Sequence, residues 1–201
     1  MSPTPPRKIV ITGGPGSGKT VVTAALVNEA PERFALVPES ATQVYALLDT
    51  RWDKLDLAGR YDAQRRMYRL QLEQESRLAS AHPGKTLLLD RGTIDGGAYW
   101  PDGPDAFWRD VGSSPQQELA RYDAVILLET CATLGLYDGD ESNFCRFEDA
   151  AGAVAAGETL KSLWADHPRV HHVGAFFKMK DKLAAVREVV RDLVGPTGAT
   201  T

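Results

Sequence analysis

The stretch Ile9-Val-Ile-Thr-Gly-Gly-Pro-Gly-Ser-Gly-Lys-Thr20 decides the fold of this chain. It starts as a short apolar run, matches the pattern G-x-x-x-x-G-K-[ST] from Gly13 to Thr20, and continues into the helical spacing of Val22 and Leu26. Glycines permit positive φ, so consecutive backbone N–H groups can converge on an anion, and the first turn of the following helix adds positive potential there. The stretch therefore predicts a buried strand, a phosphate-binding loop and a helix, in that order.

The loop carries the residue types that bind a nucleoside triphosphate. Lys19 is expected to reach the β- and γ-phosphates from a solvent-facing position, and the hydroxyl of Thr20 to bind Mg²⁺. No N-K-x-D or T-K-x-D element follows the later apolar runs, which favours ATP over GTP. The sequence thus predicts ATP and Mg²⁺ as cofactors. The predicted nucleotide-binding residues are Gly13, Gly14, Pro15, Gly16, Ser17, Gly18, Lys19 and Thr20.

Four further apolar runs have the length and composition of buried strands, and turn residues or helical patterns separate them. They cover residues 34–37, 86–89, 124–128 and 170–173. The clearest helical patterns cover residues 61–81, 116–121 and 179–193. Strands that alternate with helices imply right-handed crossovers and a parallel sheet, with ligands at the carboxyl ends of the strands. The sequence predicts an α/β fold with its functional site at that edge.

Acidic residues follow two of these runs. Asp90 ends the run at 86–89 and resembles a Walker B acid, which would hold Mg²⁺ through water opposite Thr20, while Arg91 directly after it would contact phosphate. Glu39 lies just past the run at 34–37, where a carboxylate accepts a proton from an attacking hydroxyl or simply hydrogen-bonds the substrate. Asp90 is the rival candidate for the base, and the sequence leaves this choice open.

Length and composition limit the remaining alternatives. The chain has 201 residues and a net charge of -4, which predicts one domain over residues 7–194, with flexible tails at 1–6 and 195–201, and gives no general field for nucleic acid or anionic membranes. The longest apolar runs are far shorter than the roughly 20 residues of a membrane helix. Cys131 and Cys145 are the only cysteines and form no zinc pattern, so we expect a cytoplasmic protein.

Several of these motifs together resemble those of P-loop kinases of the nucleoside-kinase and thymidylate-kinase type. Within that group, the chain resembles the small AAA-like ATPase family that includes nicotinamide-riboside-kinase modules. The resemblance rests on the phosphate loop, on Pro38-Glu-Ser-Ala41, on Asp90-Arg-Gly-Thr-Ile-Asp95 with Tyr99, and on Arg146 in the polar segment 137–149. It extends over most of the chain.

The resemblance implies a three-layer sandwich: a five-stranded parallel sheet of order 2-3-1-4-5, helices on both faces, and a lid at 137–149. It implies that Glu39 faces the acceptor, that Asp90 and Arg91 form the acid-arginine pair after the third strand, and that Arg146 is a lid arginine. Further residues that would bind the acceptor are Asp95, Tyr99, Arg65 and Arg69.

The predicted function is an ATP·Mg²⁺-dependent phosphotransferase that acts on a hydroxyl of a small molecule. Its predicted catalytic residues are Lys19, Glu39, Asp90, Arg91 and Arg146, and its predicted metal-binding residues are Thr20 and Asp90. The alternative is a nucleotide-binding switch that hydrolyses nucleotide slowly and has no small-molecule acceptor. The expected partner is the small-molecule acceptor, and we expect neither nucleic-acid binding nor membrane insertion. The sequence leaves open whether the protein forms a homodimer.

Overall fold

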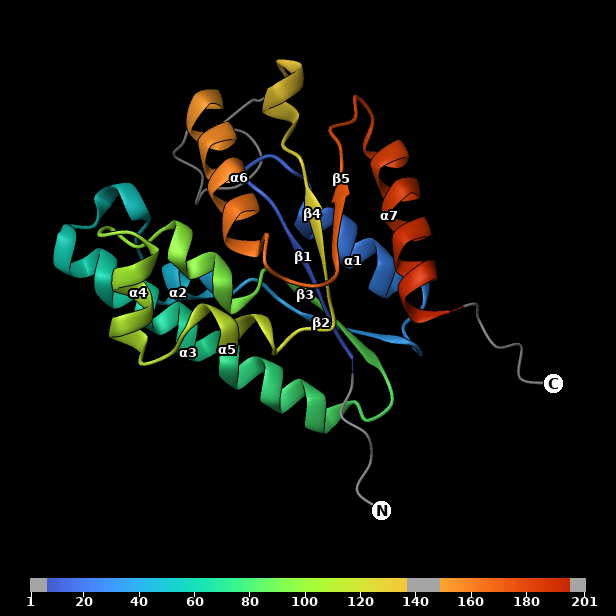
Figure 1. Ribbon diagram of the computed structural model, residues 1–201, viewed down its shortest axis with the longest axis horizontal. Coiled ribbons are helices and arrows are strands. Elements are labelled where there is room, and N and C mark those ends of the chain that lie inside the picture. Colours follow the sequence, from blue (N-terminus) through green and yellow to red (C-terminus); the bar gives the residue numbers. More distant parts are fainter. Residues whose placement is uncertain (1–6, 137–148, 196–201) are drawn as a thin grey trace.

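The computed structural model describes residues 7–136 and 149–195. Five parallel strands form one sheet in the order β2-β3-β1-β4-β5, as Figure 1 shows. The strands are β1 (Lys8–Thr12), β2 (Phe34–Val37), β3 (Thr86–Asp90), β4 (Ala124–Leu128) and β5 (Val170–Val173). The predicted fold class and strand order are therefore confirmed, and the five apolar runs of the sequence are the five strands.

The helices alternate with the strands as the pattern predicts. They are α1 (Lys19–Glu29), α2 (Ser40–Leu48), α3 (Leu57–Ala81), α4 (Pro104–Val111), α5 (Pro115–Leu119), α6 (Ala150–Trp164) and α7 (Met179–Val194). Short 3-10 turns are η1 (Trp52–Lys54), η2 (Thr93–Ala98) and η3 (Cys131–Leu134). Asp56 caps the long helix α3 by accepting a hydrogen bond from the N–H of Gly59 at 2.7 Å, so α3 begins before the predicted residue 61.

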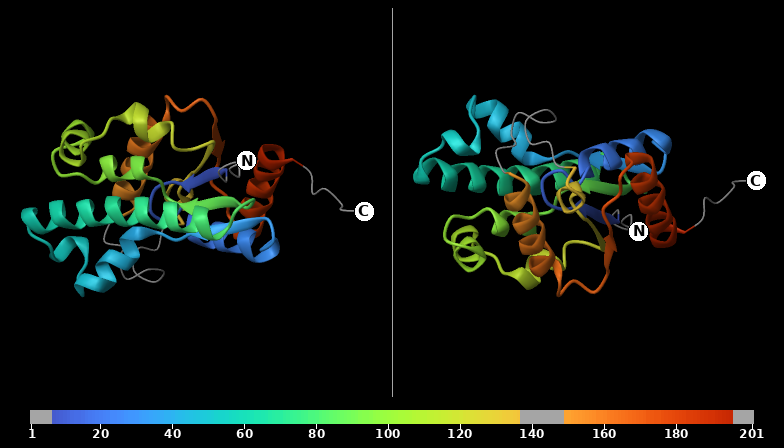
Figure 2. Two further views of the ribbon diagram at one scale, coloured as in Figure 1. Left: turned by 90° about the horizontal axis from the view of Figure 1, so that it is seen from below. Right: turned by 90° about the horizontal axis from the view of Figure 1, so that it is seen from above.

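Two hydrophobic layers hold the helices to the sheet, because alternate residues of a strand face opposite sides. Ile9 and Ile11 face α1 and α7 in one cluster, which includes Leu26 and Val186. Val10 faces the opposite cluster, with side chains from α4, α5 and α6. Figure 2 shows the resulting three layers from below and from above, with α1 and α7 together on one side of the sheet.

The register gathers the carboxyl ends of the central strands at one edge. Ile11 lies beside Asp90 of β3 and beside Ile126 of β4, so the phosphate loop that follows β1 starts next to Asp90. The helices α2 and α3 lie next to this edge, where both contribute to one cavity, and they pack on each other through a small hydrophobic cluster. Its buried members are Val44, Tyr45, Ala63 and Met67.

Two sequence predictions concern segments at the margins of the described chain. The predicted lid at 137–149 lies outside the described residues except for Asp149, which caps α6 by accepting from the N–H of Gly152 at 2.8 Å. Arg146 lies outside them too. The domain limits 7–194 stay a prediction. Among the described residues, no helix combines the length and apolarity that crossing a membrane requires.

Candidate active site

The carbonyl groups of the phosphate loop are occupied by hydrogen bonds within the protein. Five consecutive carbonyl oxygens, those of residues 14–18, each accept a hydrogen bond: from Ser17 N, Thr130 Oγ1, Cys131 N, Lys182 Nζ and Val22 N, in that order. In a trans peptide the next N–H points the opposite way. The N–H groups of Gly16, Gly18 and Lys19 therefore face the inner side of the loop, as anion binding requires.

Three loop glycines are required by their geometry. Gly13, Gly16 and Gly18 have φ of +149°, +73° and +80°, a region that disfavours side chains. A Cβ at Gly13 would come within 2.2 Å of the carbonyl oxygen of Leu128, so no larger residue fits there. The loop is thus shaped by its contacts with β4 and its neighbours as well as by its own sequence.

Lys182 supports the loop from behind. This lysine lies in α7 and is only 3% exposed. Its ammonium group donates to the carbonyl oxygen of Ser17 at 2.9 Å and to that of Glu129 at 2.8 Å. It therefore ties the phosphate loop to the exit of β4 and brings a positive charge close to the predicted phosphate site. Sequence reasoning missed it because a lysine beside an apolar helical stripe is normally exposed.

Lys19 departs from one expectation. It was expected to face solvent, but only 6% of its surface is exposed, and its charge acts on both Glu39 and Asp90. Its burial follows from its place at the start of α1, where the walls of the site surround the side chain.

Arg91 lies between two carboxylates. Its Nε donates to Oε1 of Glu39 at 2.7 Å, and its Nη1 approaches Oδ2 of Asp95 at 3.3 Å. Its guanidinium lies 5.3 Å from the centre of the Tyr99 ring. Asp95 also accepts from Trp164 Nε1 at 2.7 Å. Four residues that the sequence singled out at two strand ends thus meet in one cluster.

The two candidate bases differ in their electrostatics. Burial alone would raise the pKa of Glu39, but the charges of Arg91 and Lys19 and hydrogen bonds from Arg91 and Thr42 outweigh it and lower this pKa to about 2. Burial raises the pKa of Asp90, and the charge of Glu39 adds to the rise against the opposing charge of Lys19. Glu39 is therefore the more firmly ionised carboxylate, and Asp90 is the more basic one.

Thr20 and Asp90 have the chemistry of a magnesium site. The side chain of Thr20 lies close enough to Asp90 to lower the pKa of that carboxyl, so the two predicted metal-binding residues lie together. Oδ1 of Asp90 is buried and has no hydrogen-bond partner among the described residues. An orphaned carboxylate oxygen beside a hydroxyl suits a hard cation that keeps several water ligands. The donor set therefore fits Mg²⁺.

One cavity connects the phosphate loop to a pocket under α2 and α3. Its lining includes the charged and hydroxyl side chains of Lys19, Thr20, Glu39, Arg91 and Asp95. The larger side chains in the rest of its lining are mainly aromatic and apolar, with two amides: Tyr45, Trp52, Gln64, Met67, Tyr68, Gln71, Tyr99 and Phe107. Most of these residues were not predicted as site residues, since they come from helices whose cavity-lining face the sequence did not indicate.

The predicted arginines of α3 lie elsewhere. Arg65 forms a bidentate pair with Asp110 of α4, at 2.7 and 2.6 Å, and Arg69 is exposed. Neither lines the cavity, because the face of α3 that does so carries Gln64 and Gln71. The geometry does not support a role for these two arginines in binding the acceptor.

Solved structures share this fold. The chain superposes on the NadR protein in complex with NAD and AMP-PNP with a TM-score of 0.67 at 15% identity, and on NadR in complex with NR with 0.69 at 16%. Each match covers 95% of this chain and 50% of the NadR chain, so this chain spans half the length of NadR. Thymidylate kinase from Candida albicans matches with a TM-score of 0.66 at 14% identity, over 94% of this chain and 92% of that one.

These likenesses establish a P-loop kinase-like fold. A search of curated proteins finds no match to this chain. A family model described as an AAA domain matches residues 8–174, from the first strand to the residue after the last. That range contains the phosphate loop, the acid-arginine pair and the whole sheet, and the chain belongs to this AAA domain family.

Proposed function

We propose that this protein is an ATP·Mg²⁺-dependent phosphotransferase that moves the γ-phosphoryl group of ATP to a hydroxyl of a small, uncharged acceptor with a planar ring. The observation that carries the proposal is one cavity whose lining combines Lys19, Thr20, Glu39 and Arg91 with aromatic and amide side chains. A switch that only binds nucleotide needs no such pocket beside the γ-phosphate. The kinase-like fold agrees with the proposal.

The pocket favours an uncharged acceptor. Among the described residues, the cations in its lining are Lys19 and Arg91. Arg91 is already paired with Glu39 and lies close to Asp95, and Lys19 is expected to bind ATP. Aromatic side chains and the amides of Gln64 and Gln71 suit a planar ring with hydrogen-bonding edges. An acceptor that carries its own phosphate would find no further cation in the part of the lining that residues 7–136 and 149–195 supply.

In the proposed reaction, the acceptor oxygen forms a bond to the γ-phosphorus while the bond from that phosphorus to the β-bridging oxygen breaks, and ADP leaves. The ionised carboxylate of Glu39 orients the acceptor hydroxyl by accepting a hydrogen bond from it. As the bond to phosphorus forms, the proton of that hydroxyl passes to Glu39 or Asp90. Lys19 and Arg91 offset the charge on the transferring group. Mg²⁺, which Thr20 and Asp90 would hold, supplies charge neutralisation on the phosphates when bound. Positioning accounts for most of the catalysis.

The test is acceptor-dependent release of ADP with a panel of nucleosides, vitamins, sugars and antibiotics. At least one neutral ring compound is expected to stimulate turnover, and its phosphorylated form is expected not to. The variant Lys180→Ala, at an exposed position of α7, is the control for handling and folding. Tight binding of ATP with no stimulation by any acceptor would replace this proposal with the nucleotide switch.

A further inference from the structure

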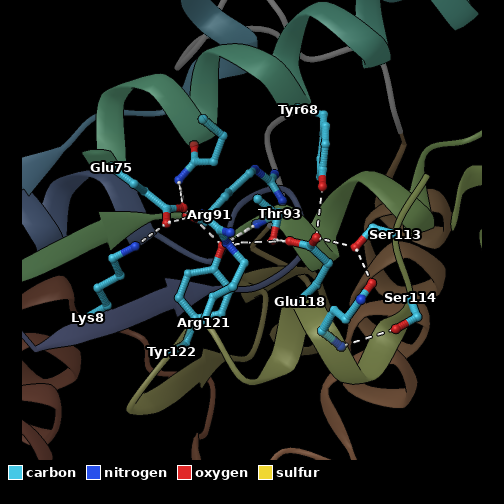
Figure 3. Close-up of polar contacts among 12 residues, drawn as sticks. Lys8, Tyr68, Glu75, Arg91, Thr93, Ser113, Ser114, Glu118, Arg121 and Tyr122 are labelled. Carbon is cyan, nitrogen blue, oxygen red and sulfur yellow. Dashed lines mark hydrogen bonds and ion pairs between the residues drawn. The ribbon is translucent and has the colours of Figure 1, made fainter. Parts of the chain in front are cut away.

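Two buried glutamates lie beneath the site without lining its cavity. Glu75 of α3 has a fully buried side chain, and that of Glu118 in α5 is 4% exposed. Figure 3 shows both within one connected group of polar side chains. Burial of a carboxylate is strongly unfavourable unless hydrogen bonds and opposite charges compensate it. The hydrogen-bond partners of these carboxylates therefore indicate which part of the protein each carboxylate stabilises.

Glu75 is well compensated. Lys8 donates to its Oε2 at 2.8 Å, while Oε1 accepts from the hydroxyl of Tyr122 at 3.0 Å and from Nε2 of Gln71 at 3.1 Å. Arg121 approaches Oε2 at 3.4 Å as a fourth partner. Two of these four partners, Gln71 and Tyr122, also contact the segment that contains Arg91. The carboxylate thus fixes two side chains that in turn reach the active-site loop.

Arg91 needs this support because its backbone is strained. Its φ is +77°, one of only two positive values among the described residues other than glycine. A residue with a Cβ adopts that region at a cost, and it persists only where the surroundings impose it. Gln71 Nε2 donates to the carbonyl oxygen of Arg91 at 3.2 Å. The N–H of Thr93 donates to the Tyr122 hydroxyl at 2.8 Å, so two side-chain hydrogen bonds hold the backbone directly after the strained residue, while the N–H of Arg91 itself donates to the carbonyl oxygen of Ile11 at 3.1 Å.

We propose that Glu75 and Tyr122 are positioning residues, which together with Gln71 hold Arg91 in its left-handed conformation and so set its guanidinium between Glu39 and Asp95 before any ligand binds. The inference rests on the proposed function only in that Arg91 is taken to offset charge on the transferring phosphoryl group. The support network, defined as Gln71, Glu75, Thr93 and Tyr122, keeps the arginine fixed, so no reorganisation is needed during turnover.

The chain offers a matched control within the same polar group. Glu118 accepts from Thr93 Oγ1 at 2.6 Å and from Tyr68 at 2.8 Å, and Ser113 binds it at its outer side. The hydroxyl of Ser113 hydrogen-bonds Glu118 and Gln117, and neither belongs to the support network. Ser113→Ala therefore removes a part-buried hydrogen bond to Glu118 and leaves the hydrogen bonds within the support network in place.

The test follows the Nε–H of Arg91 by ¹H–¹⁵N spectroscopy of the ligand-free protein, with Arg91→Lys to assign the resonance. This proton lies in the 2.7 Å hydrogen bond to Glu39, so its exchange with water is expected to be slow in the wild type and in Ser113→Ala. Tyr122→Phe is expected to speed exchange by about tenfold or more, the effect of losing one buried hydrogen bond. If Tyr122→Phe fails to fold, Glu75→Gln is expected to act in the same direction. Unchanged exchange in either folded variant overturns the proposal.

Kinetics then test the use of Arg91 separately. With an acceptor that stimulates the wild type, Tyr122→Phe is expected to lower kcat about tenfold at unchanged KM for ATP, and to have no further effect in the Arg91→Ala background. Equal losses in both backgrounds contradict positioning through Arg91. If no acceptor works with the wild type, the phosphotransferase proposal fails, while the exchange result still decides the role of the network.

Discussion

Nε of Arg91 donates to Oε1 of Glu39 at 2.7 Å, and both side chains are about five-sixths buried, with 16% and 15% of their surfaces exposed. Glu39, which the sequence predicted as a base, is therefore ion-paired with Arg91 within the site. An ionised carboxylate with a low pKa orients a hydroxyl well but accepts its proton weakly. This pair, and not an isolated glutamate, is the unit that meets the acceptor.

Glu39→Gln tests that unit. We expect kcat to fall about 10²-fold, the lower end of the range for a general base, because Glu39 acts mainly by orienting the hydroxyl. The affinity for ATP measured by calorimetry should stay close to that of the wild type. A kcat near the wild-type value would assign proton acceptance to Asp90.

The pH dependence of stability follows from the same pair. The folded-state pKa of Glu39 is about 2, below its usual value of 4.5, so the ionised form is favoured in the folded protein. Its stabilisation is fully present above pH 4.5 and is lost as the pH falls toward about 2. Denaturant unfolding should show a difference between wild type and Glu39→Gln that shrinks through this window. A difference that grows toward low pH would contradict the assigned sign.

Asp90→Asn should separate stability from function. Because the pKa of Asp90 is raised by burial and by Glu39, its ionised form is disfavoured in the ligand-free fold, and this cost sets in as the pH rises through the raised value. Asn removes the charge, so the Tm of the ligand-free protein should rise while Mg²⁺-dependent turnover is largely lost. A lower Tm in the ligand-free variant would mean that Asp90 stabilises the fold itself.

Lys182→Met should weaken phosphate binding in particular. The variant loses two charge-assisted hydrogen bonds behind the phosphate loop, and we expect the Kd for ATP to rise about tenfold or more. The Kd for adenosine, which has no phosphate, should not change. Lys180→Met on the exposed face of the same helix is the control. An equal loss for ATP and adenosine would assign Lys182 to general packing.

Gly92→Ala tests the packing beneath Arg91. A Cβ at Gly92 would lie 3.0 Å from two ring carbons of Trp164 and 3.1 Å from Val10, so the free energy of unfolding should fall by about 1–3 kcal/mol. Gly157, inside α6, has open space around an added Cβ. Gly157→Ala is expected to raise the free energy of unfolding by about 0.5–1 kcal/mol. If denaturant unfolding shows similar changes in the free energy of unfolding for Gly92→Ala and Gly157→Ala, the close packing at Gly92 is contradicted.

Much of the fold follows directly from local patterns. The buried strands are short apolar runs with turn signals at both ends, and the phosphate loop has fixed spacing, so both were predictable residue by residue. The limits of helix α6 were not predicted, because its sequence holds two glycines and many alanines, which give a weak helical period. Helix α4 was not predicted because it lies in a stretch rich in Gly, Pro and Asp, which are residue types typical of turns.

The polar interior was harder to predict than the strands. The buried face of α3 includes Gln64, Gln71 and Glu75, although residue types such as these are normally exposed. Arg65 and Arg69 of the same helix were predicted to bind the acceptor instead. Only the pairing of these side chains with Tyr122, Arg91 and their neighbours makes their burial favourable, and those partners are distant in sequence. The acids at the strand ends were found because topology alone brings them together.

The fate of the γ-phosphate is the most direct test of the central claim. The wild-type protein is incubated with ATP labelled at the γ position, Mg²⁺ and an acceptor that stimulates ADP release, and the labelled products are separated. The account predicts that the label appears on the acceptor hydroxyl in equal amount to the ADP formed, and that Lys19→Ala abolishes both. Label found only as inorganic phosphate, with or without the acceptor, would contradict it.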